Sequence, residues 1–331
     1  MPTPCAQRRN RTFAAPPTLL GRFCWSGNRC PRRTTSDGYT IMIGHVLQVT
    51  LPVFSIAAVG YVYGRLHGRE MDSANRVNLN LFVPALLFYV LSEKIPSAAQ
   101  WHSVAIGTVI IVLGSGLLAL PFTRLARLPK RVLLPSMMFN NSGNLGLPLA
   151  AFAFGDQVLP LAVVAFVVST AMHFSLGIWL VSGTFHPGTL LKNPIFLATV
   201  AGILAHAFDW HLPSILLPGL KMLSEVAIPL MLVALGVRLI GFDTRHWKSG
   251  LLGALLCPLS GLLSAFVALL WLAPEPETRN VLLLFSILPP AVMNFILAER
   301  FGQSADEVAS MVAMGNLASL LVIPLGLGFM L

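Results

Sequence analysis

Apolar runs of about twenty residues follow one another along almost the whole of this chain, and each could cross a hydrocarbon core of about 30 Å as a helix. The 331 residues are 55% hydrophobic and only 11% charged, whereas roughly a quarter of the residues in a soluble domain are charged. A water-soluble fold cannot bury that much apolar surface. The chain is therefore predicted to be an integral membrane protein.

Charged residues, prolines and glycines divide the apolar sequence into ten predicted spans. These spans must be helical, because lipid offers no hydrogen-bond partners to the backbone and the alternating pattern of a barrel strand is missing. The expected fold class is an all-α integral membrane protein of ten transmembrane helices. The predicted spans are 43–64, 75–92, 103–122, 132–152, 157–182, 193–209, 213–238, 249–272, 279–298 and 306–330.

The Lys and Arg residues between the spans indicate the orientation, because short cytoplasmic loops are rich in positive charge. If the first span runs outside to inside, twelve of these residues are cytoplasmic and only Lys94, Lys221 and Arg279 are outside. Both termini are then non-cytoplasmic in a multi-pass protein of the cell's inner (plasma) membrane. The net charge of +9 lies in these loops and at the N-terminus, which argues for a lipid bilayer and against nucleic acid as a partner.

Residues 1–41 contradict this orientation, because seven arginines precede position 34. The segment has no apolar core, and Met42 stands directly before the first apolar run. We expect a disordered basic extension with Met42 as the preferred start, and an Arg-rich targeting peptide is the alternative. Cys5, Cys24 and Cys30 lie here, and no Cys or His spacing typical of a metal site occurs, so neither a metal nor another cofactor is expected.

The two halves of the chain repeat one another at offsets of 142 to 147 residues, which predicts a repeat at 42–182 and another at 183–331. Each repeat holds five spans, and because five is odd the second repeat must be inverted. Transporters built from inverted repeats bind their substrate near the midplane, where broken helices meet. The matching pairs are Pro52 with Pro194, Pro84 with Pro229, Pro148 with Pro290, and Phe154-Gly155 with Phe301-Gly302.

The fourth and ninth spans carry residues that interrupt a helix. The fourth contains a polar, glycine-rich stretch from Asn140 to Pro148, and the ninth contains Pro289 and Pro290. Backbone groups freed at membrane depth must line a cavity, so these breaks are predicted to hold a polar or anionic solute. The alternative is that the amides only join neighbouring helices. The candidate substrate-binding residues are Asn141, Ser142, Asn144, Pro148, Pro289, Pro290, Asn294 and Asn316.

Glu225 and Asn80 are the candidates for binding a coupling ion. Glu225 is the only carboxylate well inside a predicted span and close to a proline, so it could carry a proton or bind a cation. The alternative places it at the outer interface, where a charged carboxylate costs little. His173 is expected to make a packing hydrogen bond more often than to face a cavity, and Arg238 to extend from a cytoplasmic helix end to the interface.

Several segments of the sequence match a known family. They are residues 80–88, 141–148, 193–194, 227–230, 235–236 and 289–294. Through these segments the chain resembles the auxin efflux carrier family of secondary transporters, which includes bacterial malate and malonate permeases. The resemblance implies two inverted five-helix repeats with crossed broken helices, a scaffold and a moving transport domain, as in elevator-type folds similar to Na+/H+ antiporters and bile acid symporters. It also implies organic anions as substrates, Asn141 in the binding site, proton coupling as in bacterial members, and a homodimer formed through the scaffold.

The predicted function is a proton-coupled secondary carrier of small organic anions, such as dicarboxylates or auxin-like acids. The alternative is a solute-sensing receptor or a channel with a midplane pocket. An enzyme is not expected, because H-E-x-x-H, G-x-S-x-G, a Walker loop and paired intramembrane aspartates are all missing from the sequence.

Overall fold

The computed structural model describes residues 35–68, 71–94, 96–184, 188, 191–240 and 245–330, with side chains from residue 43 onward. Helix α1 (Thr35–His67) begins within the predicted extension 1–41. The rest of that extension, including its three cysteines, lies outside the described residues. Residues Met42–Leu331 form one compact unit, and the description below concerns this unit.

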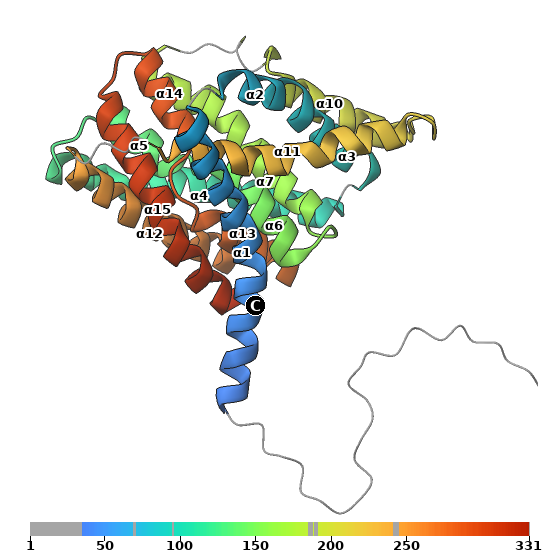
Figure 1. The fold of residues 1–331 in the computed structure, drawn as a ribbon, viewed down its shortest axis with the longest axis horizontal. Coiled ribbons are helices and arrows are strands. Elements are labelled where there is room, and N and C mark those ends of the chain that lie inside the picture. The colour runs from blue at the N-terminus through green and yellow to red at the C-terminus, as the bar shows by residue number, and fades with distance from the viewer. Residues whose placement is uncertain are drawn as a thin grey trace, which may run out of the picture. The chain divides into compact units, whose positions relative to one another are not determined.

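All regular secondary structure in the described residues is helical (Figure 1). Three segments are π-helical: η1 (Asn78–Phe82), η2 (Ser142–Gly146) and η3 (His173–Gly177). The other helices are α2 (Asp72–Val77), α3 (Val83–Glu93), α4 (Ala98–Leu125), α5 (Lys130–Met138), α6 (Leu147–Phe154), α7 (Leu159–Met172), α8 (Ile178–Ser182), α10 (Pro194–Ala207), α11 (Leu217–Arg238), α12 (Trp247–Leu272), α13 (Pro276–Ser286), α14 (Val292–Arg300) and α15 (Ala305–Met330).

Seven helical stretches of the described chain are long and apolar enough to cross a membrane, which makes this a multi-pass membrane protein. They correspond to seven of the ten predicted spans. The predicted sixth span is the 14-residue α10. The predicted fourth and ninth spans are each divided into two shorter helices. The seven stretches are Ile43–His67, Asp72–Glu93, Ala98–Leu125, Leu159–Ser182, Leu217–Arg238, Trp247–Leu272 and Ala305–Met330.

The helices form two packed groups. In the first helix group, comprising α1, α2, α3, α10 and α11, helix α3 packs against α10 and α11. In the second helix group, comprising α4–α8 and α12–α15, helix α12 packs against α15 and α4. Figure 1 shows α3, α10 and α11 gathered at the right and α12 beside α15 at the left. The groups meet mainly where α11 contacts η2 and α6, and where α7 contacts α3 and α10.

Glycines bring α1 and α11 into close contact within the first helix group. A Cβ atom on Gly60 would lie 2.1 Å from the Val233 carbonyl oxygen, and one on Gly236 would lie 1.8 Å from the Ala57 oxygen. Only glycine permits helix backbones to approach this closely, and such contacts stabilise helix pairs in lipid. The first helix group therefore depends on these two residues for its packing.

Candidate functional site

The two helix breaks that the sequence predicted lie against each other. Helix α5 ends at Met138 and helix α13 ends at Ser286, and the backbone is extended at Phe139 after α5 and at Ala291 before α14. The Asn141 N–H donates to the Pro289 carbonyl over 2.8 Å, and the Ala291 N–H donates to the Phe139 carbonyl over 2.9 Å. Since Pro289 and Pro290 have no N–H, neither can continue α13, and the freed groups pair across the crossing instead.

Three asparagine side chains hold this crossing together. Asn141 Nδ2 donates to Asn316 Oδ1 over 2.9 Å, and Asn316 Nδ2 donates to the Pro290 carbonyl over 3.3 Å. Asn294 Nδ2 donates to the Phe139 carbonyl over 2.9 Å. All three side chains are buried, so each amide satisfies a backbone or side-chain group that water cannot reach. The crossing is therefore a fixed structure rather than a loose gap between helices.

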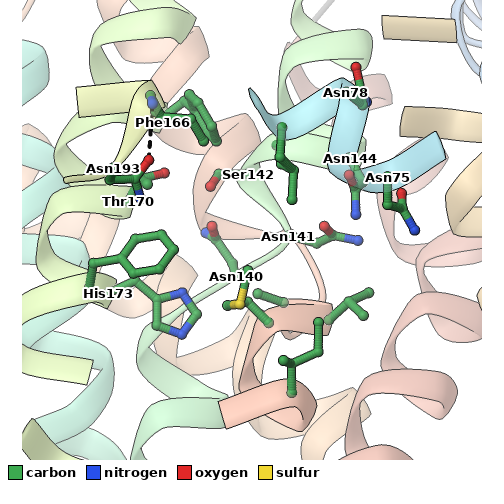
Figure 2. Close-up of a pocket in the computed structure, with 18 of the residues that line it drawn as sticks. Asn75, Asn78, Asn140, Asn141, Ser142, Asn144, Phe166, Thr170, His173 and Asn193 are labelled. Carbon is green, nitrogen blue, oxygen red and sulfur yellow. Dashed lines mark hydrogen bonds between the residues drawn. The ribbon is translucent and has the colours of Figure 1, made fainter. Parts of the chain in front are cut away.

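A cavity of about 310 Å³ lies over the crossing, at the boundary between the two helix groups. We call it the amide cavity, because seven asparagines line it. Figure 2 shows Asn140, Asn141 and Ser142 between Asn75 and Asn78 on one side and Thr170 and His173 on the other. The lining residues are Asn75, Asn78, Leu79, Asn80, Asn140, Asn141, Ser142, Gly143, Asn144, Phe166, Thr170, His173, Phe174, Asn193, Pro194, Ile195, Arg238, Ala291, Val292, Met293 and Ile296.

Each π-helical segment in the described chain contributes to the amide cavity. Asn78 and Asn80 come from η1, Ser142 and Asn144 from η2, and His173 from η3. A π-helical turn is wider than an α-helical turn and is frequent at functional sites. The three wide turns thus bring polar side chains from three separate spans into one cavity.

Three helices also begin at the amide cavity. These are the continuous η2–α6 helix, helix α14 and helix α10. Asn193 caps α10, because its side-chain oxygen accepts a hydrogen bond from the Ile195 N–H over 2.9 Å, the dashed line of Figure 2. Helix N-termini carry partial positive charge and favour anions. Three helix N-termini therefore lie at this cavity.

Arg238 is the one permanent charge among the described residues of this cavity. It is the last residue of α11 and is partly buried. None of the described carboxylates lies within salt-bridge distance of its guanidinium, and Asp72 acts on it only from farther away. A partly buried guanidinium with no close partner favours a negatively charged group beside it.

The structure brings only some of the predicted site residues into the amide cavity. Asn80, Asn141, Ser142 and Asn144 line it. Pro289, Pro290 and Asn294 form the crossing, and Pro148 is buried at the start of α6. Asn316 holds the crossing from behind and lines a separate apolar cavity of about 430 Å³ between α1, α11 and α15.

Glu225 lies in a different cavity, of about 410 Å³, between α3, α11 and the α6–α7 connection. We call it the charged cavity, because Lys94, Asp156, Lys221 and Glu225 line it. The Lys221 Nζ and Glu225 Oε1 atoms are 3.9 Å apart, and both side chains are more than half exposed. Glu225 is thus not brought together with the asparagines of the crossing.

Sequence reasoning missed Arg238, Thr170 and Phe166 as cavity residues. Arg238 stands at a helix end, where a cation commonly extends to the interface, so its direction could not be read from its position. Thr170 and Phe166 look like ordinary residues of an apolar span. Asn193, also a cavity residue, had a visible signal, since an Asn followed by Pro is a typical helix start.

Known proteins resemble this chain over most of its length. The profile of a family described as membrane transport protein matches residues 45–187 and 178–327. An uncharacterized transporter of Methanothermobacter thermautotrophicus is 29% identical over 292 residues, covering 84% of this chain and 96% of that protein. Another uncharacterized transporter, from Methanocaldococcus jannaschii, is 24% identical over 307 residues, covering 84% of this chain and 97% of that protein. The chain therefore belongs to this family of membrane transport proteins, the auxin efflux carrier family, and is a membrane transporter.

Proposed function

We propose that the protein is a secondary active carrier of small organic anions, such as dicarboxylates or auxin-like acids, and that protons drive it. The observation that carries the proposal is the lining of the amide cavity, which combines seven asparagines and Arg238 with no carboxylate among its described residues. The guanidinium and the helix N-termini attract an anion, and the neutral amides donate hydrogen bonds to it without repelling it. A cation would meet the unfavourable field of Arg238.

The amide cavity is also of a suitable size. Cavities that bind small molecules have volumes of about 300–1,000 Å³, and this one is about 310 Å³. Phe166, Phe174 and Ile296 also line this cavity and supply apolar surface. A short carboxylic acid could therefore place its charge near Arg238 and its carbon skeleton on this surface.

We further propose that transport proceeds by elevator-type alternating access, with ten spans in two inverted repeats. In this mechanism the second helix group moves the crossing past the first helix group. Two observations support it. Both the amide cavity and the charged cavity lie at the boundary between the groups. Under the predicted orientation, the amide cavity faces the cytoplasm and the charged cavity faces outward.

The proposed setting is the plasma membrane, with both termini outside the cytoplasm and a homodimer formed through the first helix group. The support for the orientation is the excess of Lys and Arg on one side of the spans. Cysteine labelling of a loop variant such as Gln157→Cys, with the native cysteines replaced by serine, tests it in intact cells. Labelling by a membrane-impermeant reagent is expected, and protection until the cells are opened would reverse the orientation.

Counterflow in proteoliposomes tests the proposed carrier. Labelled succinate outside should enter faster when unlabelled succinate is inside, because a carrier exchanges one molecule for another and a simple channel does not. Asn144→Ala is the test variant, since Asn144 is half-buried in the cavity and makes no hydrogen bond to the described residues. We expect its half-saturating concentration to rise about fivefold to tenfold, from one lost hydrogen bond.

Gln157→Ala is the matched control, because it removes an exposed amide outside the amide cavity. It should leave counterflow unchanged. Binding without counterflow would favour a receptor, and uptake that does not saturate would favour a channel. Equal effects of Asn144→Ala and Gln157→Ala would remove the amide cavity as the binding site.

A further inference from the structure

We propose that His173 carries the transported proton, and that the second negative charge of a dicarboxylate substrate keeps the proton on its ring. This inference rests on the proposed function, because it names the group through which protons couple to anion binding in the amide cavity. It differs from the sequence-based candidates, Glu225 and Asn80.

The His173 ring is held in a defined position. It lies in η3, it is 7% exposed, and it lines the amide cavity. It stacks on Phe139 with 4.2 Å between ring centroids and 5° between planes. Gly177 makes room for this stack, since a Cβ there would lie 2.7 Å from His173 Cδ2. The ring is therefore fixed against the crossing of the two helix breaks.

Two buried polar atoms at the ring lack a hydrogen-bond partner. His173 Nε2 and Asn294 Oδ1 are both buried without a hydrogen-bond partner. The two side chains are neighbours, and Asn294 is held in place because its Nδ2 donates to the Phe139 carbonyl over 2.9 Å. The Asn294 amide oxygen is the side-chain acceptor that lies beside the ring. A protonated ring donates from both nitrogens, so it would satisfy Asn294 and still offer the other nitrogen to a ligand.

No carboxylate of the described residues accompanies the ring. Helices α7 and α8 contain no ionisable side chain. Helix α5 has Lys130 and Arg131 at its exposed start, and α14 has Glu299 and Arg300 at its exposed end. Across the cavity, Arg238 is the only other described lining residue that can carry a charge. A buried charge without a counter-ion is costly, so the ring stays neutral while the cavity is empty.

Charge balance then links the proton to the substrate. Arg238 alone neutralises a bound monocarboxylate. A bound dicarboxylate leaves one negative charge uncompensated, and a proton on His173 compensates it. Histidine is the side chain whose unperturbed titration lies near neutral pH. Binding of a dianion therefore promotes binding of one proton, and release of the dianion on the other side releases the proton, as linkage requires.

The experiment measures accumulation of labelled succinate in proteoliposomes with the membrane potential clamped at zero. With the outside one pH unit more acidic, coupling to one proton predicts about tenfold accumulation, because one pH unit corresponds to a factor of ten. His173→Gln keeps a hydrogen-bond donor, in the form of an amide N–H, but cannot take up a proton. It should abolish accumulation and lower, without abolishing, succinate counterflow, because the second carboxylate then lacks its compensating charge. His102→Gln makes the same change at an exposed position outside the cavity and should keep the tenfold accumulation.

A second probe tests the charge balance in the wild-type protein. Succinamate has an amide in place of one carboxylate, so Arg238 alone should neutralise it. We expect a trapped pH dye to report proton entry with succinate and little with succinamate. Equal proton entry with both acids would overturn the charge-balance argument, whether or not His173→Gln folds. Protein-free liposomes supply the correction for passive entry of the acids.

The remaining outcomes separate the inference from the proposed function. Accumulation that persists in His173→Gln would overturn the role of His173 but not the proposed carrier function. Accumulation would persist, for example, if succinate were transported with a proton on one of its own carboxylates. The absence of wild-type counterflow with either acid would overturn the proposed function for these anions and the role of His173 with it.

Discussion

The amide cavity and the charged cavity lie at the boundary of the same two helix groups, but their linings differ in the kind of polarity. The charged cavity has exposed side chains of both signs, with Lys221 and Glu225 3.9 Å apart. The amide cavity has neutral dipoles and Arg238, which has no close carboxylate among the described residues. Water and salt screen exposed pairs, whereas a partly buried, unpaired charge keeps its field. The amide cavity, with one positive charge among neutral dipoles, should therefore select an anion better than the charged cavity, whose charges compensate one another.

The largest expected effect comes from removing the charge that distinguishes the amide cavity. Arg238→Gln should raise the half-saturating concentration for succinate counterflow about 10- to 100-fold, because a hydrogen bond to a charged group contributes about 1.5–3 kcal/mol. Arg238→Lys should raise this concentration less, since lysine keeps the positive charge but lacks the planar guanidinium group. Lys221→Gln is the matched change in the charged cavity and should stay within about twofold. Similar losses in both cavities would contradict the comparison.

The second prediction separates residues that hold the amide cavity from residues that only line it. Asn141→Ala removes the hydrogen bond to Asn316 and leaves the buried Asn316 Oδ1 without that donor. We expect a stability loss of about 1–3 kcal/mol, measured as a lower melting temperature of the detergent-solubilised protein, together with weaker counterflow. Asn144→Ala should weaken counterflow at an unchanged melting temperature. A melting temperature that falls equally in both variants would show that Asn144 is also structural.

A third, smaller effect is expected from Gly177→Ala, which should displace the His173 ring. In Gly177→Ala the new Cβ would lie 2.7 Å from His173 Cδ2 and 2.9 Å from Phe139 Cε2. Overpacking of this kind costs about 1–3 kcal/mol, and the displaced ring should slow proton-driven uptake several-fold. Gly219→Ala is the control, because a Cβ there meets nothing within 4 Å. Unchanged uptake in Gly177→Ala would mean that the ring position does not matter.

The smallest effect is expected in the charged cavity. Glu225→Gln removes an exposed ion pair that contributes about 0–1 kcal/mol, so proton-driven accumulation of succinate should change less than twofold. The measurement is the same gradient-driven uptake that tests His173. If Glu225→Gln abolishes accumulation while His173→Gln does not, proton coupling belongs to the charged cavity and the sequence-based candidate is restored.

Much of the helical architecture could be predicted from local chemistry. Pro289 and Pro290 cannot continue a helix, and the stretch around Asn141 and Ser142 weakens one. The predicted interruptions are therefore present at both places. The ten predicted spans are a less complete match, because only seven helical stretches of the described chain have spanning length. Length and hydropathy cannot distinguish a continuous helix from two half-helices that meet another broken segment.

The sequence by itself determined that the chain crosses a membrane as helices and that two of these helices are broken. Both conclusions follow from short-range constraints, namely lipid solvation of the backbone and the missing N–H of proline. Only the tertiary structure decided which side chains share a cavity. Arg238, His173 and Asn144 come from different spans and line the same cavity. Asn316 instead contacts Asn141 at the crossing and does not line that cavity. Such selection depends on helix rotation and on π-helical turns, which arise from packing between distant segments and leave no local signal.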